Sequence, residues 1–203
     1  MPSDHIYIRP ESWDKPFEAP EHVCSSYDNC HVPWGSTHEK TWHLVKTLPH
    51  VSGLFVWTGF DYLGEPTPYW WPSRSSFFGI VDLAGFPKDV YYMYKSEWTD
   101  EPVLHIFPHW NWKEGERVDI WAYYNNADEV ELYLNGKSLG VRQKTDSTYH
   151  VSWRVPFTPG TLRAVSRLGG KEVLVKEIHT AGEPARLVLT PDRSVIQADG
   201  SDL

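Results

Sequence analysis

The sequence predicts two architectural classes in one chain, a parallel α/β segment followed by an all-β antiparallel sandwich. Over the first hundred residues, a helical pattern, a strand-like run, a long loop and a second helical pattern follow one another, as in parallel α/β units. From Val103 onward, short runs of alternating apolar and polar residues recur at regular spacing, which is typical of an antiparallel sandwich. The pair Asn135 and Gly136 between two of these runs is a strong hairpin signal.

Two helices are predicted in the first part. The first covers Ser36–Leu48, where Ser36 and Glu39 have the spacing of a capping box and apolar residues recur on one face. The second begins near Pro87, because proline is favoured in the first turn of a helix, and continues to about Glu97.

Between these helices, Leu54–Trp57 has the length and the β-favouring residues of a strand, and Phe77–Val81 is a shorter extended segment. One strand and two helices are too few units to close a parallel sheet. An incomplete sheet leaves strand edges and apolar faces uncovered. We therefore expect residues 1–100 to pack against the sandwich or against a second copy of the chain.

Six runs are predicted as strands of the sandwich, and alternate apolar residues in the first two share one face within each run. These runs are Arg117–Tyr124, Glu129–Leu134, Lys137–Arg142, Tyr149–Val155, Thr161–Ser166 and Glu172–Ile178. The alternation indicates two inner faces that meet in one core.

Domain boundaries are predicted near Asp100–Pro102 and at the linker-like Thr180–Pro184. They divide the chain into residues 1–102, residues 103–180 and residues 181–203. In the last part Ala185–Thr190 is expected to begin a new strand, but only about two strands fit there. The sequence is therefore expected to be cut from a longer polypeptide at both ends.

Composition excludes several classes of partner. The formal net charge is −8 and the sequence has no cluster of Lys and Arg, which argues against a nucleic-acid partner. No apolar run approaches the roughly 20 residues that a membrane helix needs, and the N-terminus lacks a signal-peptide pattern. Cys24 and Cys30, with His22 and His31, match no zinc spacing, so we expect no metal, no cofactor and no disulfide framework.

The strongest candidate for a functional site is the segment from Gly53 to Trp71. It combines a strand-like run, which ends at Trp57, with a loop rich in aromatic residues that contains Asp61 and Glu65. Ligands in parallel α/β folds bind at the carboxyl ends of strands. An indole matches the apolar face of a pyranose and carboxylates match its hydroxyl rim, so the segment favours a sugar. The alternative is that Trp57 packs in the core.

Residues 53–98, GLFVWTGFDYLGEPTPYWWPSRSSFFGIVDLAGFPKDVYYMYKSEW, resemble the end of the catalytic barrel of bacterial family 2 glycoside hydrolases, the β-galactosidase group. VELYLNGKSLG, residues 130–140, resembles the immunoglobulin-like domain that follows that barrel. The resemblance implies that residues 1–102 are the C-terminal part of a (β/α)8 barrel and that residues 103–180 are an immunoglobulin-like β-sandwich. It also implies a carbohydrate partner and, because family members are commonly oligomeric, a homo-oligomer.

The resemblance implies site residues as well. Trp57 matches the position that forms part of the sugar-binding wall, and Asp61, Glu65, Tyr69, Trp70 and Trp71 fall where the rim of the pocket would be. Phe78 and Gly79 match the turn that shapes its floor. The family uses two glutamates in a retaining mechanism. Neither has a matching motif here, so no catalytic residue is assigned and the chain by itself is expected to lack turnover.

Three other interpretations are open from the sequence. Asp61 and Glu65 could form a catalytic pair, although two carboxylates of one loop seldom approach a ring from its two sides. Exposed tryptophans such as Trp110, Trp112 and Trp153 could make the chain a carbohydrate-binding module, unless they fill the core. The sandwich could also be a structural spacer without a hydrolase role.

Overall fold

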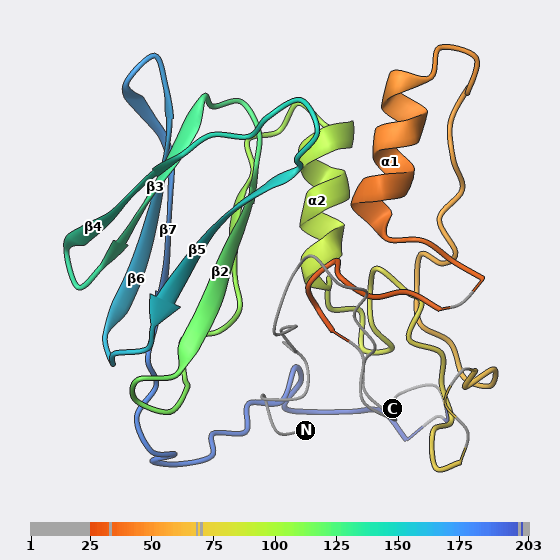
Figure 1. Ribbon diagram of the computed structural model, residues 1–203. Coiled ribbons are helices and arrows are strands. Elements are labelled where there is room, and N and C mark those ends of the chain that lie inside the picture. The colour runs from red at the N-terminus through yellow and green to blue at the C-terminus, as the bar shows by residue number, and fades with distance from the viewer. Residues whose placement is uncertain (1–24, 33, 68, 70, 199, 201–203) are drawn as a thin grey trace.

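The computed structural model describes residues 25–32, 34–67, 69, 71–198 and 200 (Figure 1). Within these residues it contains two helices followed by seven strands. The helices are α1 (His38–Thr47) and α2 (Asp89–Trp98), and the strands are β1 (Leu104–Phe107), β2 (Arg117–Tyr124), β3 (Glu129–Leu134), β4 (Lys137–Arg142), β5 (His150–Pro156), β6 (Thr161–Leu168) and β7 (Lys171–His179).

The strands form two antiparallel sheets, one with the order β1-β2-β5 and the other with the order β4-β3-β6-β7. The sheets face each other, and both helices lie on the outer side of the three-stranded sheet (Figure 1). The inner faces meet in a core that includes Val118, Ile120 and Ala122 of β2 and Val130 and Leu132 of β3. The predicted antiparallel β-sandwich and its two inner faces are thus confirmed.

The alternating runs located the strands closely, and β2, β3 and β4 have the predicted bounds. Asn135 and Gly136 join β3 to β4 with φ values of 51° and 80°, the left-handed conformations that a two-residue hairpin turn requires. Strand β1 was not predicted. It has only four residues between Pro102 and Pro108, which is too short for an alternation to be recognised.

Strand β2 is buried on both faces, and its second face joins the helices to the sandwich. Trp121 and Tyr123 point away from the sandwich core and pack with Tyr27, Met93 and Tyr94 in a second buried cluster. Part of the region that precedes β1, including α2 and Tyr27, therefore packs against the sandwich, which is the first of the two arrangements expected for an incomplete sheet.

The N-terminus of α1 is capped by a residue that the sequence did not indicate. The predicted capping box is wrong, because Thr37 is the N-cap residue and makes no side-chain capping bond. The carboxylate of Asp28 instead accepts hydrogen bonds from the backbone N–H groups of His38 and Glu39, at 2.8 and 2.7 Å. Burial raises the pKa of this carboxyl group. A capping partner ten residues away cannot be recognised from a local spacing pattern.

Two predicted strands are absent. Leu54–Trp57 is extended but is not part of a strand, because among the described residues it has no continuous ladder partner. Ala185–Thr190 is likewise irregular and exposed, so the prediction of a strand there is wrong. Neither helix of the described chain is long and apolar enough to cross a membrane.

One carboxylate ties both helices to the sandwich. Glu97 of α2 accepts hydrogen bonds from the indole N–H of Trp42 at 2.9 Å, from Lys46 Nζ at 2.8 Å and from Lys144 Nζ at 3.3 Å. Burial favours the neutral acid, but the bonds from Lys46 and Trp42 and the charge of Lys144 outweigh it and lower the pKa of Glu97. Burial also lowers the pKa of Lys144, which Glu97 partly offsets.

We expect Glu97→Gln to lower the free energy of unfolding at pH 7 by about 2 kcal/mol, because the substitution leaves Lys144 without its charged partner. A carboxylate with a lowered folded-state pKa stabilises the fold above its unfolded pKa of about 4.3 and loses this contribution as the pH falls through the folded-state pKa. The difference between variant and native protein should therefore shrink below about pH 4. Urea unfolding at pH 7 and below about pH 4 measures this difference in the free energy of unfolding.

Glu101→Gln is the matched control, since Glu101 pairs with Lys95 at 2.8 Å on the exposed surface. Exposed ion pairs contribute little to stability, so the free energy of unfolding of this variant should be close to that of the native protein. An equal effect of both substitutions would contradict the assigned role of Glu97.

Candidate functional site

The candidate site lies on a loop whose two sides are held together by backbone hydrogen bonds. The N–H of Thr58 donates to the carbonyl of Phe78 at 3.1 Å, the N–H of Ile80 donates to the carbonyl of Thr58 at 3.0 Å, and the N–H of Asp61 donates to the carbonyl of Val81 at 2.9 Å. A single parallel bridge joins Phe60 to Val81. These bonds fix the backbone that carries the aromatic residues of the loop.

Gly79 permits this close approach. A Cβ atom at this position would lie 2.1 Å from the backbone nitrogen of Asp61 and 2.4 Å from the carbonyl carbon of Phe60. Such distances are far below van der Waals contact, so only glycine fits here. The structure therefore gives a packing reason for the glycine of the predicted floor turn.

Asp61 is buried beneath the loop rather than displayed on it. Its Oδ1 accepts a hydrogen bond from the N–H of Gly79 at 2.8 Å, and its Oδ2 lies 2.7 Å from Lys88 Nζ. Lys88 is the N-cap residue of α2, so this ion pair fastens the loop to the helix. Both carboxylate oxygens are thus engaged within the fold, which gives no support to a catalytic pair of Asp61 and Glu65.

Trp57 is held on the surface with 72% of its area exposed. Its indole N–H donates to the hydroxyl of Tyr62 at 3.2 Å, and the two rings meet edge to face. The hydroxyl of Tyr62 donates in turn to Glu65 Oε2 and the hydrogen bond raises the pKa of Tyr62. Trp57, Tyr62 and Glu65 therefore form one hydrogen-bonded row, and nothing in the sequence distinguishes Tyr62 from the other aromatic residues of the loop.

The segment before Thr58 has two different faces. Val56 packs toward the helices in the second buried cluster, whereas its neighbours Phe55 and Trp57 are exposed. Alternate residues of an extended chain point to opposite sides. The exposed face of this segment is therefore apolar and aromatic, and no described residue covers it.

The other aromatic residues of the loop differ in placement. Trp71 is 74% exposed, and the guanidinium of Arg74 lies 4.8 Å from the centre of its ring. Tyr69 packs edge to face on Phe77 with the ring centres 5.2 Å apart. Trp70 lies outside the described residues.

The tryptophans of the sandwich are part of its core. Trp110 and Trp153 are 0% and 4% exposed, and each indole N–H donates to a backbone carbonyl, of Thr158 and Gly140 respectively. Trp112 is partly buried against the same core and stacks on His109. These residues cannot grip a glycan, so the carbohydrate-binding module based on them is not supported.

No group of side chains suited to a metal ion occurs among the residues that the structure describes. Cys30 is partly buried, burial raises the pKa of its thiol, and His31 hydrogen-bonds the carbonyl of Val32. Cys24 and His22, the other members of the cluster considered from the sequence, lie outside the described residues.

Comparisons with known proteins place the chain among glycosidases. Residues 115–174 match a family described as a domain of unknown function, DUF4982. Over 203 residues the chain is 63% identical to the β-galactosidase BoGH2A of Bacteroides ovatus, with 100% of this chain and 24% of that protein covered.

Two solved structures are similar as well. A β-glycosidase from Bacteroides vulgatus has a TM-score of 0.76 and 37% identity, with 88% of this chain and 22% of that chain covered. A glycosyl hydrolase family 2 member from Bacteroides cellulosilyticus has a TM-score of 0.67 and 32% identity, with 80% and 26% covered. The chain thus spans about a quarter of the length of each of these relatives.

Proposed function

This chain belongs to glycoside hydrolase family 2, and we propose that it supplies one wall of the sugar-binding pocket of a longer, β-galactosidase-like enzyme. The observation that carries the proposal is the fixed, exposed indole of Trp57 beside Tyr62 and Glu65. A large exposed apolar surface rimmed by polar groups marks a binding site. Here the apolar indole suits the C–H face of a pyranose and the carboxylate suits its hydroxyl groups.

We assign the loop residues different roles within this wall. Trp57 stacks on the sugar, Glu65 accepts hydrogen bonds from its hydroxyl groups, and Trp71 forms part of the rim. Trp70, whose position is not described, is assigned to the same rim from its place in the sequence. Asp61 does not contact the sugar directly, but positions the loop through Gly79 and Lys88.

The proposal includes the architecture of the longer enzyme. Residues 1–102 would be the C-terminal part of its (β/α)8 barrel, residues 103–180 an immunoglobulin-like domain, and residues 181–203 a linker and the start of a further β domain. Two features support a barrel strand near Trp57, namely the parallel bridge between Phe60 and Val81 and the alternation of Val56 with two exposed neighbours. In a barrel, strand residues face the helices and the interior in turn.

The reactive carboxylates would come from the rest of the polypeptide. A retaining enzyme needs one acid/base and one nucleophile about 5 Å apart on either side of the glycosidic bond. In the described part of the chain, Glu65 is hydrogen-bonded to Tyr62 and Asp61 is ion-paired with Lys88, so neither is assigned such a role. The part played by this chain is to orient the sugar, which lowers the barrier by holding the bond near those carboxylates.

The carboxylate beside Trp57 favours a neutral sugar over a uronic acid. A uronate would bring its own negative charge toward Glu65, and the repulsion between like charges disfavours its binding. We therefore propose a β-galactoside-like glycan as the substrate.

The test compares the purified 203-residue chain with the complete polypeptide on 4-nitrophenyl β-galactoside. We expect no hydrolysis above background by the chain alone, because it lacks the two glutamates, and turnover by the complete protein. The corresponding glucuronide should be a poorer substrate of the complete protein. Hydrolysis by the chain alone, or a preference for the glucuronide, would contradict the proposal.

A further inference from the structure

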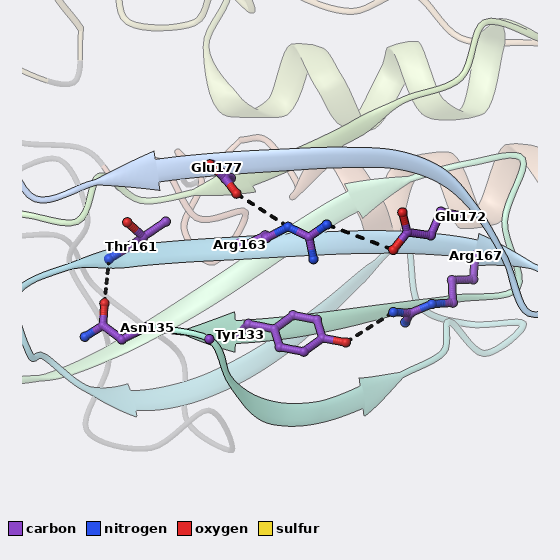
Figure 2. Close-up of a pocket in the computed structure, with 8 residues that line it drawn as sticks. Tyr133, Asn135, Thr161, Arg163, Arg167, Glu172 and Glu177 are labelled. Carbon is purple, nitrogen blue, oxygen red and sulfur yellow. Dashed lines mark hydrogen bonds and ion pairs between the residues drawn. The ribbon is translucent and has the colours of Figure 1, made fainter.

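A hollow lies on the outer face of the four-stranded sheet (Figure 2). Its volume is about 470 Å³, and residues from β3, β6, β7 and the β3–β4 turn line it. This volume is within the range of small-molecule sites, roughly 300–1,000 Å³. Trp110, Trp112 and Trp153 do not line it, so the hollow differs from the tryptophan-based binding surface considered from the sequence.

One side of the hollow is rigid. Arg167 donates to Glu131 at 2.8 Å and to the hydroxyl of Tyr133 at 3.1 Å, and that hydroxyl donates to the same glutamate. At the turn, the side chain of Asn135 accepts a hydrogen bond from the N–H of Thr161 at 2.8 Å. These bonds fix the ring of Tyr133 and the floor around it before any ligand arrives.

The centre of the hollow contains polar groups that are close to one another but not hydrogen-bonded. Arg163 forms ion pairs with two glutamates, with its Nε 3.4 Å from Glu177 Oε1 and its Nη2 4.0 Å from Glu172 Oε1 (Figure 2). Its guanidinium lies 5.8 Å from the centre of the Tyr133 ring and makes no hydrogen bond within the described chain. Guanidinium donors and carboxylate acceptors with free capacity thus face the same space.

We infer that this hollow is a second carbohydrate site, which takes a neutral, hydroxyl-rich sugar independently of the surface around Trp57. Adjacent hydroxyl groups both donate and accept, so they can bridge Arg163 and the two glutamates, while Tyr133 offers an apolar ring. The two arginines and two glutamates that line the hollow balance in charge. That balance gives an anionic ligand no net attraction and favours an uncharged one.

The experiment is an amide-resolved NMR titration of the 203-residue chain with lactose and cellobiose, and with glucuronate as the anionic comparison. We expect saturable shifts at the amides of Gly136, Thr161 and Arg163, with a dissociation constant on the order of 1–10 mM, the weak end of specific binding. Absence of saturable shifts at these amides with both disaccharides, or tighter binding of glucuronate, would overturn the inference.

Four variants locate the site. Arg163→Ala and Glu177→Gln should each weaken binding by about tenfold or more, as expected when a charged hydrogen-bonding group is lost. Arg142→Ala, which removes an exposed arginine of β4 outside the hollow, should leave it unchanged. Trp57→Ala should also leave these shifts intact, which separates this site from the proposed barrel wall. If the NMR spectra show that Arg163→Ala and the native chain are both folded and their dissociation constants are equal, the assignment is refuted.

Discussion

Gly79→Ala is expected to open the loop that carries Trp57 while the sandwich stays folded. The added Cβ would lie 2.1 Å from the nitrogen of Asp61, and its other close neighbours are also backbone atoms, in Phe60 and Val81. Backbone atoms cannot rotate away as the end of a side chain can. The two sides of the loop must therefore separate.

This separation has several consequences at once. It removes the backbone hydrogen bonds between residues 58–61 and 78–81, and it removes the hydrogen bond from the N–H of Gly79 to the carboxylate of Asp61. We expect the loop to lose at least about 3 kcal/mol of local stability, the upper part of the range for overpacked sites. The core of the sandwich shares no residue with the loop, so its stability should change little.

Hydrogen exchange measures the two regions separately. The amides of Thr58, Asp61, Ile80 and Val81 should exchange roughly 100-fold faster in the variant, since about 1.4 kcal/mol corresponds to each tenfold step. Amides of β2 and β6 should keep their protection. Gly59→Ala is the matched control, because nothing lies within 4 Å of a Cβ at that position of the same loop. Equal protection in the two variants would show that the close approach at Gly79 is not required.

The sandwich could be predicted from the sequence because its information is local. Alternation along each strand and the Asn135–Gly136 turn are set by residues next to one another, and they gave the bounds of β2, β3 and β4. The same alternation could not show that β2 is buried on both faces. Trp121 and Tyr123 occupy positions that would be polar in a free sandwich, and the packing of α2 and Tyr27 against them explains why they are aromatic.

The candidate site could be predicted only in part. The exposure of Trp57 agrees with its expected place at the end of an extended segment, whereas a strand at Leu54–Trp57 needs partners that are not among the described residues. For a carboxylate in an aromatic loop, the sequence does not show whether the side chain faces a ligand or the protein. Asp61 and Glu65 are four residues apart, yet one is buried against Lys88 and the other reaches Tyr62 on the surface.

Trp57→Ala in the complete polypeptide is expected to reduce kcat/KM for a β-galactoside by about 100-fold. The substitution removes the exposed indole that is proposed to stack on the sugar, and loss of this stacking together with the hydrogen bond to Tyr62 costs about 2.7 kcal/mol. Stacking acts on the bound sugar before and during bond cleavage. Most of the loss should therefore appear as a raised KM, with a smaller fall in kcat.

Two further variants separate stacking from a general loss of structure. Trp57→Phe keeps a ring but lacks the indole N–H, so it should retain part of the activity and lose only about tenfold in kcat/KM. Trp34→Ala removes another exposed tryptophan, 66% accessible and outside the loop, and should have little effect. Because Trp57 packs mainly on the surface, its alanine variant should unfold at nearly the native temperature. Native-like kinetics in Trp57→Ala would mean that the indole does not contact the sugar, and the proposed wall would have to be placed elsewhere.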